Sequence, residues 1–145
     1  MKNKALLDAN VLIAAFDESH AEHRRARDYV AGLREFHTCP QTQGAFLRFF
    51  TRPWTDASGV RREPRLSTGH AMSQLRAIVS QRAHRFLPDS LPFTSVSLKS
   101  LSGFKQWNDA YLIALARQHK LELATLERKL DNMDPGDPAV LHLIP

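Results

Sequence analysis

The segment Leu6-Leu7-Asp8-Ala9-Asn10-Val11-Leu12-Ile13 decides the fold. An apolar run that begins at Ala5 stops at the Asp8 carboxylate and then resumes. A short apolar run between polar residues is typical of a strand that is buried on both faces. In an open parallel sheet, ligands bind beyond the carboxyl ends of the strands, which is where Asp8 would stand. A second interpretation stays open, in which Asp8 and Asn10 only turn the chain and cap a helix that starts near Val11.

The length and composition indicate one domain. The chain has 145 residues, of which 43% are hydrophobic, so residues 1–145 suffice for a single sizeable core. No apolar run approaches the roughly 20 residues that span a bilayer, and the basic start lacks a signal-peptide cleavage site. We therefore expect a cytoplasmic protein without membrane contact. Its single cysteine, Cys39, excludes an intrachain disulfide and is expected to be a small buried side chain.

Positive charge is concentrated in the middle of the chain. The net charge is +5, and residues 48–85 contain eight arginines against only Asp56 and Glu63. This asymmetry favours a polyanionic partner such as nucleic acid, because guanidinium groups bind phosphates in a bidentate manner. A well-solvated surface would show the same pattern.

Hydrophobic periodicity predicts helices that alternate with strands. Helices are predicted over residues 20–35, where Ser19 opens a capping box, and over 41–50, 67–81 and 109–119. After the first strand, further strands are predicted at residues 36–39, 86–87, 121–126 and 140–144, and a mobile loop at 54–64. We expect His20 and His23 to pack in a first helical turn and not to bind a metal. The alternation indicates an α/β fold with a parallel sheet.

Three carboxylates are expected at one edge of this sheet. Asp8 ends the first strand, Asp109 opens an apolar helix, and Glu127 follows the strand at 121–126. Carboxylate oxygens without His or Cys companions suit Mg²⁺ or Mn²⁺ and argue against zinc. A divalent ion would relieve the repulsion between the acids and stabilise the anionic transition state of phosphodiester cleavage. Taken singly, Asp109 and Glu127 are equally well explained as acids at helix starts.

Five short blocks follow one another along nearly the whole chain. They are LLDANVLI (6–13), TCP (38–40), GAFLR (44–48), WNDAYL (107–112) and LATLER (123–128). Together they resemble the PIN-domain ribonucleases of the VapC toxin type. The resemblance implies a three-layer α/β/α sandwich with a central, mainly parallel sheet, and a Mg²⁺- or Mn²⁺-dependent endoribonuclease. It also implies an antitoxin that folds around the toxin, a homodimer, and structured RNA of the translation apparatus as substrate.

The resemblance assigns roles to particular residues. The first and third acids of the family match Asp8 and Asp109, the fourth falls on Glu127 where Asp is common, and the second, a Glu, falls on Gln43. Gln43 loses a charge but keeps a carbonyl oxygen that would orient a water or bind an ion weakly; alternatively, it donates its amide hydrogen to Asp8 or to RNA. The expected residues are Asp8, Asp109 and Glu127 for metal binding and catalysis, Gln43 for catalysis, Asn10 and Thr125 for supporting hydrogen bonds, and Arg48, Arg52, Arg61, Arg62 and Arg65 for RNA binding.

Two other functions stay open. Because Gln43 replaces a family Glu, the chain would also suit a PIN-like module that binds RNA or a partner without cutting. A phosphatase of the haloacid-dehalogenase type also places an Asp after its first strand. That family requires a second Asp two residues later, where this chain has Asn10.

Overall fold

A five-stranded sheet forms the centre of the computed structural model, which describes residues 3–99, 101, 103–133 and 140–145. Every pairing within this sheet is parallel, in the order β5-β2-β1-β6-β7. The strands are β1 (Lys4–Leu7), β2 (Glu35–Thr38), β5 (His84–Phe86), β6 (Glu122–Thr125) and β7 (Leu141–Leu143). The predicted parallel sheet is confirmed, with each strand within a few residues of its expected place.

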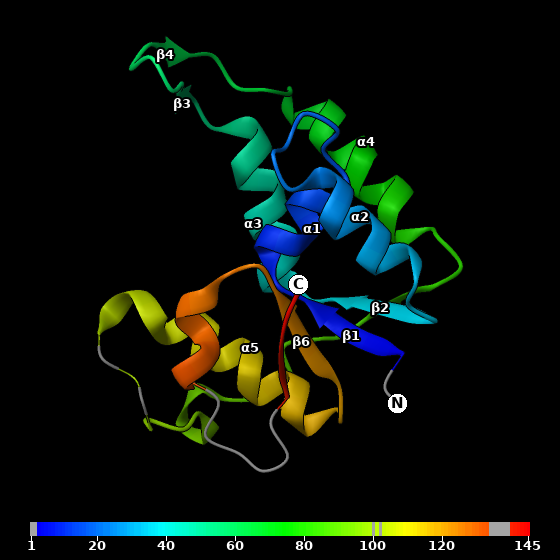
Figure 1. Cartoon of the computed structure of the whole chain (residues 1–145), viewed down its shortest axis with the longest axis vertical. Helices are drawn as coiled ribbons and strands as arrows, with labels where there is room; N and C mark the ends of the chain where they lie inside the picture. Colours follow the sequence, from blue (N-terminus) through cyan, green and yellow to red (C-terminus); the bar gives the residue numbers. More distant parts are fainter. Residues whose placement is uncertain (1–2, 100, 102, 134–139) are drawn as a thin grey trace.

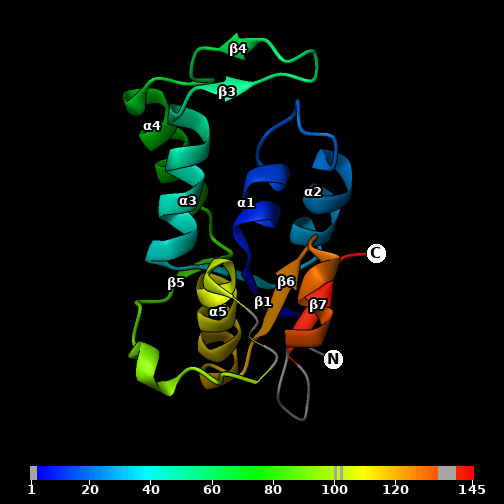
Figure 2. The same cartoon turned by 90° about the vertical axis from the view of Figure 1, so that its left-hand side faces the viewer.

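Helices cover both faces of the sheet (Figures 1 and 2). One face carries α1 (Ala9–Ala15), α2 (His23–Ala31), α3 (Pro40–Thr51) and α4 (Thr68–Val79), and the other carries α5 (Trp107–Gln118). Short 3-10 helices occur at Phe93–Ser95, Phe104–Gln106 and Arg128–Met133. The predicted three-layer α/β/α arrangement is therefore confirmed. Within the described ranges, no helix combines the length and apolar character needed to cross a membrane.

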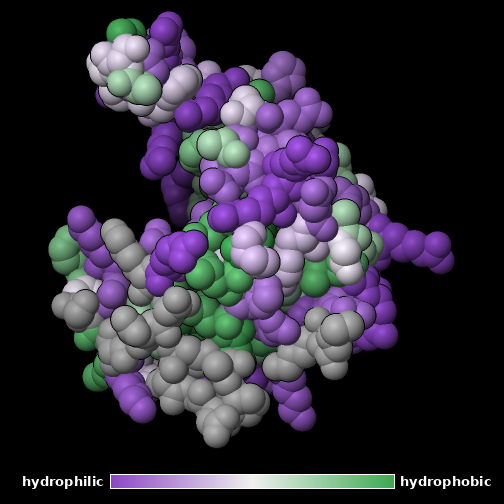
Figure 3. All heavy atoms as spheres, in the orientation of Figure 1, coloured by the Kyte–Doolittle hydropathy of each residue, from purple (hydrophilic) through white to green (hydrophobic). Residues whose placement is uncertain are grey.

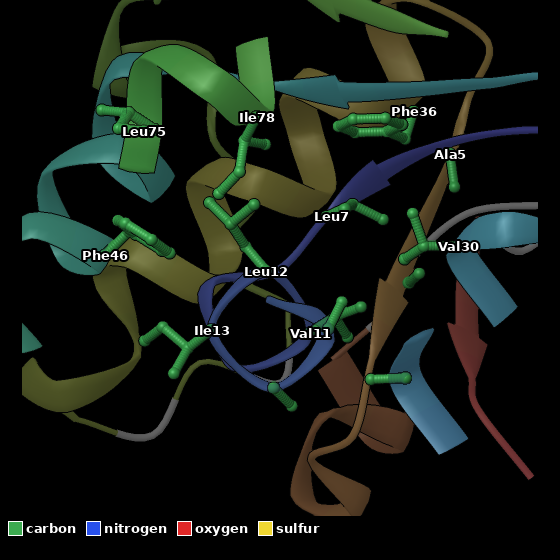
Figure 4. Packing of buried hydrophobic residues seen from close by; sticks show 14 of the residues in the cluster. Ala5, Leu7, Val11, Leu12, Ile13, Val30, Phe36, Phe46, Leu75 and Ile78 are labelled. Carbon is green, nitrogen blue, oxygen red and sulfur yellow. The ribbon is translucent and has the colours of Figure 1, made fainter. Parts of the chain in front are cut away.

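The alternation of side chains along β1 divides the hydrophobic core into two parts. Ala5 and Leu7 pack under the four-helix face, whereas Leu6 packs on the face of α5. Above Leu7, buried side chains of α1, α3 and α4 point toward one another; Figure 4 labels Leu12, Ile13, Phe46, Leu75 and Ile78 among them. Because β1 is buried on both faces, its position in the sheet is strongly specified.

The second helix begins later than the sequence predicts. The Ser19 hydroxyl donates to the Asp17 carboxylate at 2.7 Å, so the capping box expected at Ser19 does not form. Helix α2 starts at His23, whose Nδ1 lies 2.8 Å from the carbonyl oxygen of Ala14 in α1. His23 therefore packs against the neighbouring helix, as expected.

The segment predicted as a mobile loop, 54–64, instead contains a small antiparallel ladder. Strands β3 (Trp54–Thr55) and β4 (Arg61–Arg62) pair, and Figures 1 and 2 show them projecting beyond α3. The Asp56 carboxylate accepts a hydrogen bond from the Val60 backbone N–H at 2.9 Å, which closes the turn. Hydrogen bonds from the Asp56 side chain to the backbone hold the turn of this very short ladder. Hydrophobic periodicity does not reveal such bonds.

Truncation of a core leucine should show how far the fold depends on this packing. Leu12 is fully buried in α1, so we expect Leu12→Ala to lower the free energy of unfolding by about 3 kcal/mol through lost burial and cavity formation. Leu98 is 66% exposed, and Leu98→Ala should change it by less than about 0.5 kcal/mol. Urea denaturation measures both values. Equal effects would contradict the assignment of Leu12 to the core.

Candidate active site

The strand order reverses between β1 and β6. From β1, the chain builds outward through β2 and β5 on one side, and β6 and β7 complete the other side. A reversal of this kind opens a crevice beyond the carboxyl ends of the two central strands. Asp8 directly follows β1, and Glu127 lies two residues after Thr125, the end of β6. The topology therefore brings both acids to one sheet edge, the candidate crevice.

Asp8 is held by hydrogen bonds from two elements. Its Oδ1 accepts from the Ala9 backbone N–H at 2.8 Å, and its Oδ2 accepts from the Thr125 hydroxyl at 2.8 Å. The backbone N–H of Asp8 also donates to the Ala124 carbonyl at 2.9 Å. Asp8 thus caps α1 and is joined to β6, so the helix cap and the sheet-edge position belong to the same residue.

Asn10 ties the other side of the crevice to this network. Its Nδ2 donates to Thr125 Oγ1 at 3.3 Å, and its Oδ1 accepts from the Leu126 backbone N–H at 3.2 Å. Thr125 Oγ1 also accepts from the Glu127 backbone N–H at 3.0 Å. The side chains of Asn10 and Thr125 therefore fix the turn that carries Glu127 relative to Asp8.

The three acids influence one another electrostatically. Burial raises the pKa of Asp8, and the charge of Glu127 raises it further against the lowering effect of its hydrogen bonds. Burial also raises the pKa of Asp109, in the first turn of α5, to about 6, and the charges of Asp8 and Glu127 add to this rise. Accumulated negative charge with oxygen donors is the chemistry that a hard cation satisfies.

The arrangement of the acids limits how an ion would be held. In the part of the chain that the structure describes, no three His, Cys, Asp or Glu side chains lie close enough to enclose a metal ion. A site of this kind fits an ion that keeps much of its water, as Mg²⁺ commonly does with only one or two protein carboxylates. Asp8, Asp109 and Glu127 thus fit a hydrated ion better than a closed protein cage.

Gln43 lies in α3, which leaves the sheet edge beside α1. Its Nε2 donates to the Thr38 hydroxyl at 3.0 Å, and Thr38 Oγ1 lies 2.7 Å from Nε2 of His84. Among the described residues, Gln43 forms no hydrogen bond with the three acids. No role of Thr38 or His84 was predicted from the sequence, although Thr38, like Asp8, is a polar residue at the end of a buried strand.

Arg48 lies in the last turn of α3, and Arg52 caps the end of that helix. Arg48 is therefore the nearer of the two to the helix start at the sheet edge. A Cβ on Gly44 would stand 3.1 Å from Nη1 of Arg48, so the guanidinium group folds back over Gly44 toward the sheet edge. Gly44 therefore provides the space that this conformation requires. Arg48 itself is exposed.

The hairpin arginines differ in their surroundings. The Arg65 guanidinium lies 3.9 Å from the centre of the Trp54 ring and 4.5 Å from that of Phe49, so it braces the hairpin against α3. Arg62 Nε donates to the Asp56 carboxylate at 2.9 Å. Arg61 is exposed, and Arg52 lies 5.9 Å from the Phe49 ring. Figure 3 shows the hairpin as a knob of mixed polarity set apart from the body.

Comparison with known proteins decides the family. A family model for the PIN domain matches residues 5–135. The chain belongs to the PIN-domain family. The predicted resemblance is therefore confirmed. Similar curated proteins include Ribonuclease VapC29 of Mycobacterium tuberculosis, 39% identical over 94% of each chain, and Ribonuclease VapC44 of the same species, 32% identical over 88% of each.

Solved structures share the fold of this PIN domain. One is VapBC2 from Rickettsia felis bound to a DNA fragment from its promoter, with a TM-score of 0.62, 13% identity, and coverage of 98% of this chain and 99% of that chain. Another is a toxin–antitoxin complex from Klebsiella pneumoniae, with a TM-score of 0.59, 18% identity, and coverage of 97% and 98%. At these identities, the likeness establishes the fold alone.

Removing the charge of Asp109 should stabilise the metal-free PIN domain. The pKa of Asp109 rises from 3.8 to about 6 on folding, so the folded protein binds this proton more tightly than the unfolded chain. In the wild type, the contribution of protonated Asp109 to folding stability is therefore complete below the unfolded pKa and is lost as the pH rises through the folded pKa. Because Asp109 is half-exposed, we expect Asp109→Asn to add on the order of 1 kcal/mol at about pH 7.5, or about 3 °C in Tm.

Scanning calorimetry without metal measures this gain, which should shrink toward about pH 4, where Asp109 is protonated in both variants. Exposed Glu63 supplies the control, because Glu63→Gln removes one charge far along the chain from the crevice. A lower Tm for Asp109→Asn at neutral pH would show that the acids do not repel one another.

Proposed function

We propose that this PIN domain is a Mg²⁺- or Mn²⁺-dependent endoribonuclease that acts as the toxin of a toxin–antitoxin pair. The observation that carries the proposal is the hydrogen bond from Thr125 to Asp8 at the reversal of strand order. It fixes a buried carboxylate within electrostatic reach of Asp109 and Glu127. The relatives named Ribonuclease VapC29 and Ribonuclease VapC44 support the activity.

The three acids would bind the ion and orient the attacking water. Asp8 and Asp109 would hold the ion, because burial leaves their charges poorly solvated by water. When bound, Mg²⁺ or Mn²⁺ supplies Lewis-acid activation of a phosphodiester and of the attacking water. Glu127 is exposed on the turn that Asn10 and Thr125 fix, and its carboxylate would bind the ion or orient that water. Gln43 would contribute a neutral amide oxygen at the start of α3.

The arginines would hold the RNA beyond the reacting phosphodiester. Arg48, folded over Gly44, lies nearest along α3 to the crevice, and exposed Arg61 extends the basic surface onto the hairpin. Arg62 and Arg65 mainly keep the hairpin in shape, through Asp56 and the aromatic rings. A surface that reaches past the cleavage position suits structured RNA, and we infer an RNA of the translation apparatus as substrate.

We also infer an antitoxin partner, a homodimer and a cytoplasmic location. The structural neighbours include a toxin–antitoxin complex. Large hydrophobic side chains are exposed along residues 93–107, up to the first residue of α5, and exposed apolar surface of this kind can mark a protein contact. They are Phe93, Leu98, Phe104 and Trp107. Light scattering of the isolated protein and of its complex with the antitoxin measures both assemblies.

Removal of the Asp8 charge tests the catalytic proposal. We expect Asp8→Asn to lower RNA cleavage at least about a hundredfold, because it removes a charged ion ligand, while its single amide oxygen can keep one of the two hydrogen bonds from Ala9 and Thr125. EDTA should abolish wild-type cleavage and Mn²⁺ should restore it. Circular dichroism verifies the fold, and Glu63→Gln is the charge-matched control. RNA binding without cleavage by the wild type, or cleavage that persists in EDTA, would overturn the proposal.

A double substitution tests the RNA surface. Arg48→Ala with Arg61→Ala should weaken RNA binding and reduce the slope of log K against log salt by about 1.5, because each lost phosphate contact removes about 0.7 to 0.9. The control removes equal charge from α2, through Arg24→Ala with Arg27→Ala. Fluorescence anisotropy over a range of salt concentrations gives both slopes. The same change of slope in both double variants would mean that only net charge matters.

A further inference from the structure

The Thr38 hydroxyl joins three elements at the sheet edge. Thr38 is the last residue of β2 and is fully buried. Its Oγ1 contacts Nε2 of His84 in β5 at 2.7 Å and Nε2 of Gln43 in α3 at 3.0 Å. Since β2 is the parallel neighbour of β1 and Leu6 pairs with His37, Thr38 stands one residue before the level of Asp8.

The direction of these hydrogen bonds is determined by counting hydrogens. An amide nitrogen only donates, so Thr38 Oγ1 accepts from Gln43. A hydroxyl has one hydrogen, which then goes to His84, and Nε2 of His84 must be unprotonated to accept it. The chain of donation therefore runs from Gln43 to Thr38 and on to His84.

The surroundings of His84 favour the neutral ring that this direction requires. Burial lowers the pKa of His84, and two neighbouring groups, His37 on β2 and Arg85 on its own strand, lower it further against the effect of the Val79 hydrogen bond. The ring also packs edge-on against Phe36, with 5.4 Å between centroids. A neutral ring with its hydrogen on Nδ1 leaves Thr38 only lone pairs to offer Gln43.

We propose that His84 is a positioning residue that acts through Thr38 to orient the Gln43 amide, so that its carbonyl oxygen is turned away from Thr38. The nitrogen and oxygen of one amide point in different directions, so binding the nitrogen at Thr38 fixes the direction of the oxygen. A neutral acceptor of fixed direction would then stand at the position where the family has a carboxylate. This inference rests on the proposed function for its consequence, but the hydrogen-bond direction stands independently of catalysis.

The tautomer of His84 tests the direction without any measurement of activity. We expect the ¹⁵N shifts of the labelled full-length protein to show hydrogen only on Nδ1 at about pH 7. Gln43→Glu should reverse the direction, because a carboxylate only accepts, Thr38 must then donate to it, and Nε2 of His84 must donate to Thr38. The pKa of His84 should therefore rise by at least about one pH unit. Hydrogen on Nε2 in the wild type would overturn the inference.

A double variant separates this relay from a simple charge effect. If the hydroxyl transmits the change, Gln43→Glu combined with Thr38→Val should leave the pKa of His84 near its value in Thr38→Val alone. Charge acting through space would raise it equally in both backgrounds, which would overturn the relay.

The consequence for cleavage is tested with a matched pair at one position. Thr38→Val keeps the shape of the side chain and removes the hydroxyl, so kcat should fall about fivefold to tenfold with KM within about twofold of wild type. Thr38→Ser keeps the hydroxyl and should restore kcat to within about twofold. Equal kcat for Thr38→Val and wild type would overturn the positioning role. If the wild type cleaves no RNA at all, the proposed function fails and the ¹⁵N shifts still decide the hydrogen-bond direction.

Discussion

The hydrogen bond from the Thr125 hydroxyl to the Asp8 carboxylate depends on one pairing of two parallel strands. Leu7 stands opposite Ala124 in that pairing, which places the next residues, Asp8 and Thr125, side by side at the sheet edge. A slip of one residue would turn every side chain of β1 to the opposite face. The apolar run of β1 is bounded by Lys4 and Asp8, so a slip would draw one of these charged residues into the sheet, which opposes it. The same register of β1 and β6 therefore determines both the packing of the core and the position of Asp8 beside Thr125.

The crevice also shows how much of a site follows from local sequence. The position of Asp8 at the sheet edge could be predicted because it ends a buried apolar run, and the positions of Asp109 and Glu127 near it followed once the sheet was taken as parallel. The partner of Gln43 could not be predicted. Thr38 meets His84 across 46 residues of sequence, through the pairing of β2 with β5, and a three-residue strand such as β5 leaves only a weak periodic signal.

Elements that rest on side-chain contacts were predicted least well. The two-residue strands of the hairpin depend on the hydrogen bonds of Asp56 and on the stacking of Arg65, neither of which leaves a hydrophobic period. The start of α2 likewise shifted because Ser19 found a closer acceptor in Asp17. Periodicity gave the elements that bury apolar surface, while competition between polar side chains determined where the others begin.

The bracing of the hairpin by Arg65 separates two responses to ionic strength. Contacts between exposed arginines and phosphates weaken as dissolved ions screen them, over a Debye length of about 8 Å at physiological salt. The Arg65 guanidinium lies against the Trp54 and Phe49 rings, half-buried and at contact distance, where screening has little effect. A rise in salt would thus release a bound polyanion, while the stacking of Arg65 would keep the hairpin in place against α3. Rebinding at lower salt would then require no rearrangement of the hairpin.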